Sequence, residues 1–144
     1  MSTAPEVARA ALESARVVAV LGASDKAWRA GCYVPEYLNS VGYKLIPINP
    51  RLTGSKLWGQ PVLATLADIQ EPVDIVDIFR DSASLPGHLD ELLAMSPLPT
   101  LVWLQLGVDH PDFTAAVARA GIPMVADRCT LADHRAFGLG PVQW

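Results

Sequence analysis

Residues 16–26 read RVVAVLGASDK, and this stretch decides the fold class. Its apolar part, Val17–Leu21, contains no polar residue and is typical of a strand that is covered on both faces. The run breaks at Gly22, passes Lys26, and gives way to a helical pattern after Arg29. Backbone N–H groups at the start of such a helix bind phosphate groups. The stretch therefore predicts an α/β domain with a site for an anionic nucleotide.

Four more apolar runs of this kind follow, and helical patterns separate them. We expect strands at Val17–Leu21, Lys44–Ile48, Val73–Phe79, Thr100–Leu104 and Ile122–Ala126. We expect helices at Pro5–Ala15, Tyr33–Val41, Ser82–Met95, Asp112–Ala120 and Thr130–Phe137, a short turn at Leu66–Ile69, and one loop-like insertion at Pro50–Val62. The alternation predicts a single Rossmann-like three-layer domain over residues 1–144, with a five-stranded parallel sheet.

Single residues mark the expected helix ends. Gly42 and Gly121 each stand between a helix and a strand, where a left-handed C-terminal cap is favoured. Ser82 and Asp112 stand where N-caps are expected. Pro35 is compatible with its helix if it falls within the first turn.

The composition limits the class of protein. A chain of 144 residues with 51% hydrophobic and 18% charged residues is typical of one globular domain. A net charge of −4 argues against a nucleic-acid partner, and no apolar run is long enough to cross a membrane. Cys32 and Cys129 are too far apart to suggest a disulfide framework, which favours the cytoplasm. His88, His110 and His134 have no spacing typical of zinc ligands.

The residues that follow each strand predict where a ligand binds. Ligands of open α/β sheets bind at the carboxyl ends of the strands. Four cationic residues, one after each of four strands, are therefore expected on one rim of an otherwise acidic protein: Lys26, Arg51, Arg80 and Arg128. Such a rim favours a polyanionic ligand.

The loop after the first strand differs from the dinucleotide-binding fingerprint. It has no second glycine two residues after Gly22, so it does not read G-x-G-x-x-G. The second strand ends in Asn49-Pro50-Arg51 instead of the acidic residue that binds the ribose of NAD. NAD is therefore disfavoured, and the absence of a Walker spacing disfavours ATP hydrolysis further.

With these motifs assembled, the chain resembles the small CoA-binding protein family, whose fold is similar to the CoA-binding domain of the succinyl-CoA synthetase alpha subunit. The resemblance covers nearly the whole chain. The matching segments are Val20–Lys26 with Arg29, Val41–Tyr43, Ile46–Pro50, Pro72–Arg80, Val102–Gly107, and Asp127–Cys129 with His134. Asp133 departs from the pattern, because a glutamate is common there.

The resemblance implies that CoA lies across the strand ends. It places the pyrophosphate and ribose phosphate at Gly22, Ala23, Ser24, Lys26 and Arg29, and the adenosine over Asn49, Pro50 and Arg51. It places the middle of the ligand at Phe79 and Arg80, and the pantetheine arm near Gln105, Gly107, Asp127, Arg128 and Cys129.

Several of these residues also allow a structural interpretation. Arg80 and Arg128 contact either the ligand or nearby aspartates, since surface ion pairs are common. Cys129 is by default an inert, buried thiol. The alternative hypothesis places Cys129 near the CoA thiol, where it forms a mixed disulfide under oxidation.

The favoured interpretation is a non-catalytic module that binds CoA or acyl-CoA as a carrier, sensor or regulatory partner. The alternatives are an NAD(P)-binding subunit similar to an oxidoreductase and an interaction scaffold without a ligand. A homodimer or a partner enzyme is also compatible with the sequence, and Trp144 would suit a dimer interface.

Overall fold

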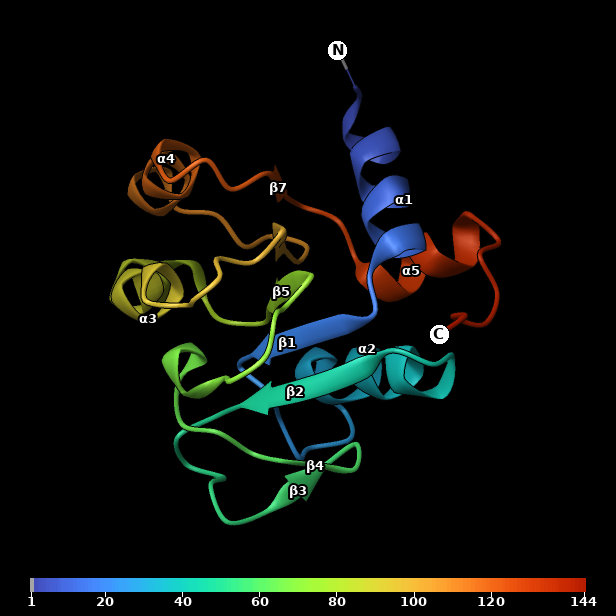
Figure 1. The fold of residues 1–144 in the computed structure, drawn as a ribbon, viewed down its shortest axis with the longest axis horizontal. Helices are drawn as coiled ribbons and strands as arrows, with labels where there is room; N and C mark the ends of the chain where they lie inside the picture. Colours follow the sequence, from blue (N-terminus) through green and yellow to red (C-terminus); the bar gives the residue numbers. More distant parts are fainter. Residues whose placement is uncertain (1) are drawn as a thin grey trace.

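The structure is a computed structural model that describes residues 2–144. Its central sheet has five parallel strands in the order β2-β1-β5-β6-β7 (Figure 1). These strands are β1 (Val17–Leu21), β2 (Lys44–Ile48), β5 (Ile75–Ile78), β6 (Leu101–Leu104) and β7 (Met124–Val125). The predicted five-stranded parallel sheet is confirmed, although its last strand is shorter than expected.

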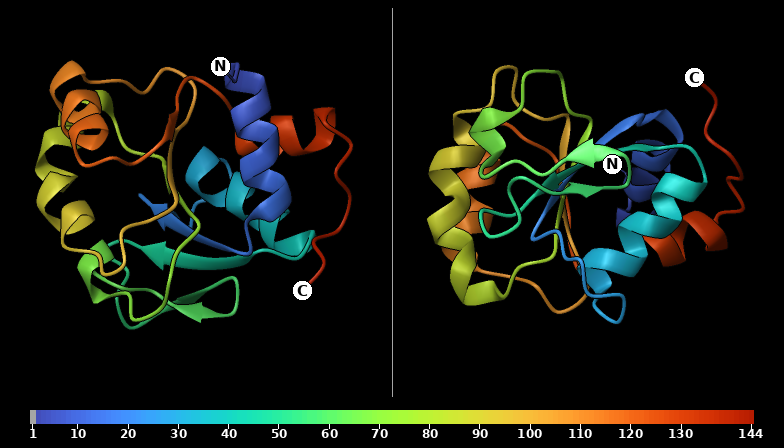
Figure 2. Two further views of the ribbon diagram at one scale, coloured as in Figure 1. Left: turned by 45° about the horizontal axis from the view of Figure 1, so that its top comes forward. Right: turned by 90° about the horizontal axis from the view of Figure 1, so that it is seen from below.

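Helices cover both faces of the sheet (Figure 2). One face packs against α1, α2 and α5, and the other against η2, α3 and α4. Successive residues of β1 point to opposite faces, and all of Val18–Leu21 are buried. This two-sided burial explains the unbroken apolar run in the sequence. The helices are α1 (Ala4–Ser14), α2 (Ala30–Ser40), η1 (Leu66–Asp68), η2 (Ser82–His88), α3 (Leu89–Leu93), α4 (Pro111–Arg119) and α5 (Thr130–Ala136).

The two glycine caps are confirmed. Gly42 and Gly121 have φ values of 111° and 79°, in the left-handed region that glycine reaches without strain. After α2, the N–H of Tyr43 donates to the carbonyl of Leu38 at 3.1 Å, which satisfies an orphaned carbonyl of the last turn.

The prediction of one helix over Ser82–Met95 is wrong, because the structure has two shorter helical elements in this segment. The 3₁₀ helix η2 ends at His88, and the α-helix α3 covers only Leu89–Leu93. Pro86 lies inside η2, where it provides no N–H for a continuous α-helical ladder. The N-cap of η2 is Asp81 and not Ser82.

Two other helix starts also differ from the prediction. The N-cap of α4 is His110, whose ring accepts a hydrogen bond from the N–H of Asp112, the predicted cap. Helix α2 begins at Ala30, three residues before the predicted start at Tyr33. Pro35 therefore lies in the interior of α2 and not in its first turn.

The insertion predicted as a loop contains a small hairpin. Strands β3 (Lys56–Leu57) and β4 (Gln60–Pro61) pair in antiparallel fashion. The two turn residues, Trp58 and Gly59, have φ values of 52° and 77°. Positive φ at both positions is the type I′ turn that suits a tight hairpin.

Candidate functional site

A cavity of about 740 Å³ opens at the carboxyl ends of the central strands. Strand β1 lies between β2 and β5. After β1, the chain therefore first forms β2 on one side of it and later forms β5 on its other side. Such a switch in strand order leaves a crevice where ligands of doubly wound sheets bind. Gly22, Asn49 and Phe79, which follow these three strands, all line the cavity.

The first loop is held tightly between β1 and α2. A Cβ atom on Gly22 would lie 2.8 Å from the carbonyl oxygen of Phe79, and φ at Gly22 is 89°. A Cβ atom on Gly31 would lie 2.6 Å from the carbonyl oxygen of Gly22. Only glycine permits this close approach, which brings the start of α2 to the cavity wall.

Pro35 contributes to the same loop from the interior of α2. Because proline has no N–H, it cannot donate to the carbonyl of Gly31, four residues earlier. The N–H of Ser24 donates to that carbonyl instead, at 3.1 Å. The proline therefore leaves an acceptor free in the helix, and this acceptor anchors the loop.

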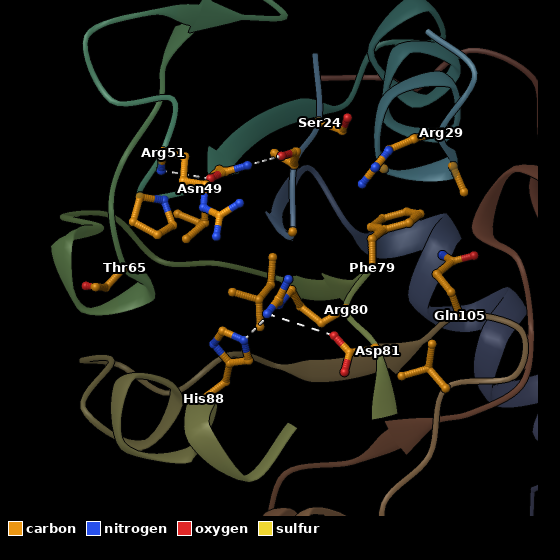
Figure 3. Close-up of a pocket in the computed structure, with 18 of the residues that line it drawn as sticks. Ser24, Arg29, Asn49, Arg51, Thr65, Phe79, Arg80, Asp81, His88 and Gln105 are labelled. Atoms are coloured by element: carbon orange, nitrogen blue, oxygen red, sulfur yellow. Dashed lines mark hydrogen bonds and ion pairs between the residues drawn. The ribbon is translucent and has the colours of Figure 1, made fainter. Parts of the chain in front are cut away.

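Three guanidinium groups, from Arg29, Arg51 and Arg80, line the cavity. Figure 3 shows Arg29 and Arg51 on two sides of the cavity and Arg80 beside His88. Within residues 2–144, the side chains of Arg29 and Arg51 make no hydrogen bond or ion pair. Their charges are thus available to an anionic ligand.

Asn49 connects the first two strand ends. Its amide donates to the carbonyl of Ala23 at 2.8 Å, and its side-chain oxygen accepts from the N–H of Arg51 at 2.9 Å. Since both ends of the amide are engaged, Asn49 orients the loop and the Pro50–Arg51 turn together.

A buried polar cluster supports the far wall of the cavity. The amide nitrogen of Gln105, which lines the cavity, donates to Asp77 at 2.6 Å and to the Thr130 hydroxyl at 3.1 Å. That hydroxyl in turn donates to Asp77 at 2.9 Å. Burial raises the pKa of Asp77 to about 7, although both hydrogen bonds act in the opposite direction. The cluster directs the Gln105 amide nitrogen away from the cavity.

Four polar or charged cavity residues were missed by sequence reasoning: Thr65, Asp81, His88 and Glu91. His88 Nδ1 lies 2.9 Å from Glu91 Oε2, and Arg80 Nε donates to His88 Nε2 at 3.2 Å. The available signal was the spacing of a histidine and a glutamate three residues apart, shortly after the arginine that ends β5. That spacing is too common to be decisive by itself.

The structure brings ten of the fifteen predicted residues to the cavity and leaves five outside its lining. Gly22, Ala23, Ser24, Arg29, Asn49, Pro50, Arg51, Phe79, Arg80 and Gln105 line it; Lys26, Gly107, Asp127, Arg128 and Cys129 do not. The predicted convergence of four cations is therefore reduced to two, Arg51 and Arg80, joined by Arg29. Ligand contact stays a prediction for all fifteen.

Structural contacts account for four of the five outlying residues. Arg128 forms a two-pronged ion pair with Asp133 at 2.7 and 2.9 Å. The sequence had suggested Asp77, Asp81 or Asp127 as its partner. Asp127 accepts the N–H of Gly107 at 3.0 Å. Cys129 stands at the N-cap position of α5, where its side chain makes no capping hydrogen bond and packs against the hydrophobic core.

A Rossmann-like sheet with a glycine loop and arginines at its switch point is the architecture of a nucleotide-binding domain. The chain belongs to the CoA binding domain family, whose sequence profile matches residues 16–135. It is 29% identical over 123 residues to the Bacillus subtilis protein named "Uncharacterized protein YneT", an alignment that covers 85% of this chain and 88% of that one.

Solved structures share the fold. A Thermus thermophilus protein, described as cell-free ID.343, is 47% identical, with a TM-score of 0.87 over 94% of this chain and 98% of that chain. A dinucleotide-forming acetyl-coenzyme A synthetase from Ca. Korarchaeum cryptofilum is 21% identical, with a TM-score of 0.67. That match covers 78% of this chain and 26% of the synthetase chain, and it shows similarity of fold alone.

Residues 2–144 contain no group of three or more histidine, cysteine or acidic side chains placed to hold a metal ion. None of their helices is both long and apolar enough to span a membrane.

Proposed function

We propose that this protein binds CoA or acyl-CoA in the cavity at the strand ends and acts as a non-catalytic carrier, sensor or regulatory module. The observation that carries the proposal is the placement of Arg29, Arg51 and Arg80 around one cavity beside the Gly22–Ser24 loop. CoA bears a pyrophosphate and a separate ribose phosphate, so it presents anionic groups at more than one point. Guanidinium groups on two sides of a cavity match such a distribution.

The size of the cavity is compatible with this ligand class. Its volume of about 740 Å³ lies within the range of small-molecule and cofactor sites. In the proposed arrangement, the pyrophosphate binds the first loop and Arg29, and the adenosine lies near Asn49, Pro50 and Arg51. Phe79 and Arg80 contact the middle of the ligand, and the pantetheine arm runs toward Gln105.

One observation supports a non-catalytic role. Three polar side chains of the cavity, those of Asn49, Gln105 and His88, are engaged with other groups of the protein. The cytoplasmic location and a homodimer or partner enzyme stay predictions.

Calorimetric titration with CoA, dephospho-CoA, NAD and ATP tests the proposal. We expect CoA to bind most tightly, and Arg29→Ala and Arg51→Ala each to weaken it by about 1.5–3 kcal/mol, the range for a hydrogen bond to a charged group. Lys26→Ala measures whether that lysine reaches the ligand as predicted. Arg119→Ala, in the last turn of α4, is the matched control and should leave affinity unchanged.

Two results would contradict the proposal. Tighter binding of NAD than of CoA would favour the oxidoreductase-like alternative. Binding of none of the four nucleotides by the folded protein would favour a scaffold. Incubation with acetyl-CoA, followed by chromatography of acyl-CoA and free CoA, tests the non-catalytic role, and consumption of acetyl-CoA would refute that role.

A further inference from the structure

A chain of three charged or titratable side chains crosses the floor of the cavity. Arg80 Nε lies 3.2 Å from His88 Nε2, and His88 Nδ1 lies 2.9 Å from Glu91 Oε2. The other Glu91 oxygen accepts the N–H of Leu66, at the start of η1, at 2.9 Å. The side chains of His88 and Glu91 are each about one fifth exposed. The carboxylate is therefore fixed behind the imidazole, and the imidazole faces the arginine.

The hydrogen-bond chemistry determines the protonation of His88 in this arrangement. Arginine can only donate, so His88 Nε2 must accept and cannot carry a hydrogen. The hydrogen of the neutral ring is then on Nδ1, where Glu91 accepts it. Burial by itself raises the pKa of Glu91, but the hydrogen bonds from His88 and Leu66, together with the positive charge that His88 carries when it is protonated, outweigh burial, and the net pKa is lowered. The carboxylate thus stays ionised and available to stabilise an imidazolium.

An anion between Arg80 and His88 would reverse the preference for a neutral ring. In the free protein, a proton on His88 Nε2 would point at the Arg80 guanidinium. Two hydrogen-bond donors and two positive charges would then face each other, which is unfavourable. A bound anion accepts from both groups and separates their charges. Histidine is the side chain whose charge changes most readily near neutral pH, so this rearrangement is accessible to it.

We propose that Arg80 and His88, with Glu91 behind them, form a subsite for a phosphate monoester, and that occupation of this subsite transfers one proton from solvent to His88 Nε2. The subsite deepens the proposed function, on which it rests. Two cationic groups facing one anion match a doubly charged monoester better than the singly charged phosphates of a pyrophosphate diester. On CoA, this group is the ribose phosphate, so the subsite assigns Arg80 to the ribose phosphate instead of to the middle of the ligand.

Two other carboxylates, those of Asp81 and Asp68, act on the chain of Arg80, His88 and Glu91. Asp81 lies on the far side of Arg80, with its Oδ1 3.9 Å from Arg80 Nη2, and its carboxylate is engaged by the Ser84 hydroxyl. Asp68, on η1, acts on Glu91 and disfavours its charge. Arg80 Nη2 also donates to Ser84 at 3.2 Å, so the guanidinium can release His88 while it keeps one protein contact.

Calorimetry in two buffers of different ionisation enthalpy, at pH 7.5, tests the subsite. We expect wild-type protein to take up a measurable fraction of one proton on binding CoA, and less on binding dephospho-CoA. His88→Gln should lose that uptake and bind CoA about tenfold more weakly, which corresponds to about 1.4 kcal/mol. It should bind dephospho-CoA as the wild type does. His110→Gln, which alters a histidine outside the cavity, should retain the uptake.

The possible results separate this inference from the proposed function. If wild-type protein binds CoA but His88→Gln leaves both proton uptake and affinity unchanged, the subsite is refuted and the proposed function stands. An equal loss for CoA and dephospho-CoA would refute the monoester assignment. If no CoA binds at all, the proposed function fails and this inference fails with it. Should His88→Gln not fold, Glu91→Gln must show reduced uptake for the proposal to hold.

Discussion

Replacement of Asp77 by asparagine should stabilise the protein at alkaline pH. Asp77 is fully buried in β5, and within residues 2–144 the hydrogen-bond donors to its carboxylate are the Gln105 amide and the Thr130 hydroxyl. Burial disfavours the charge more than these two donors favour it, which raises the pKa from 3.8 to about 7. Asparagine has nearly the same shape and no charge, and a rotation of the Gln105 amide would provide the acceptor that its own amide needs.

The sign and magnitude follow from linkage. Between about pH 4 and pH 7 the folded protein holds a proton on Asp77 that the unfolded chain has lost, so unfolding becomes easier as the pH rises. At about 1.4 kcal/mol per pH unit, a rise in pKa from 3.8 to about 7 amounts to at most about 4 kcal/mol. This contribution to stability is present below pH 3.8 and is lost as the pH passes 7.

Urea unfolding of both proteins from pH 4 to pH 8 measures this effect. The advantage of Asp77→Asn over wild type should grow by about 1.4 kcal/mol per pH unit below pH 7 and then level off. Other titrating groups cancel in the difference. Asp90→Asn, at an exposed position in α3, should show no such growth. A pH-independent difference for Asp77→Asn would refute the reasoning.

Three further predictions follow from the first loop and from Cys129. Gly31→Ala should lower the free energy of unfolding, measured by urea titration, by about 1–3 kcal/mol, because its Cβ would lie 2.6 Å from a backbone oxygen. As a control, Gly87→Ala should lower the free energy of unfolding by less, because no atom lies within 4 Å of its Cβ position. Pro35→Ala should restore a helical donor that competes with the Ser24 N–H, so faster hydrogen exchange at Ser24 is expected, and unchanged exchange would contradict this. Because Cys129 does not line the cavity, we expect Cys129→Ser to take up CoA disulfide as the wild type does under oxidation. A loss of uptake in this variant, detected by mass spectrometry, would support the mixed-disulfide hypothesis.

Several residues of the candidate site were predictable because they depend on local sequence. The apolar run Val17–Leu21 and the glycine after it predicted a buried strand with a ligand-binding loop. In a parallel sheet all strands end at the same edge, so the residues after β1, β2 and β5 come together whatever the details of packing. Gly22, Asn49 and Arg80 were found in this way, and all three line the cavity.

Other features depend on contacts between distant segments. Pro35 looked like a constraint on where a helix begins, whereas its role is to leave the Gly31 carbonyl free for Ser24. Arg128 follows the end of its strand closely, as Arg80 does, yet it pairs with Asp133 on α5 and does not line the cavity. Residue type and spacing do not distinguish these two arginines, because the distinction depends on which helix packs beside each strand end.

The sequence by itself thus determined the fold class, the edge of the sheet at which the cavity opens and ten of the residues that line this cavity, because hydrophobic periodicity and strand ends are local properties. Only the tertiary structure decided that His88 and Glu91 join the cavity. Their helical segments, η2 and α3, lie on the opposite face of the sheet from α2, and the break between them follows from packing and from Pro86. The orientation of such a segment depends on packing against residues that are far away in the chain. A local sequence pattern contains no information about this packing.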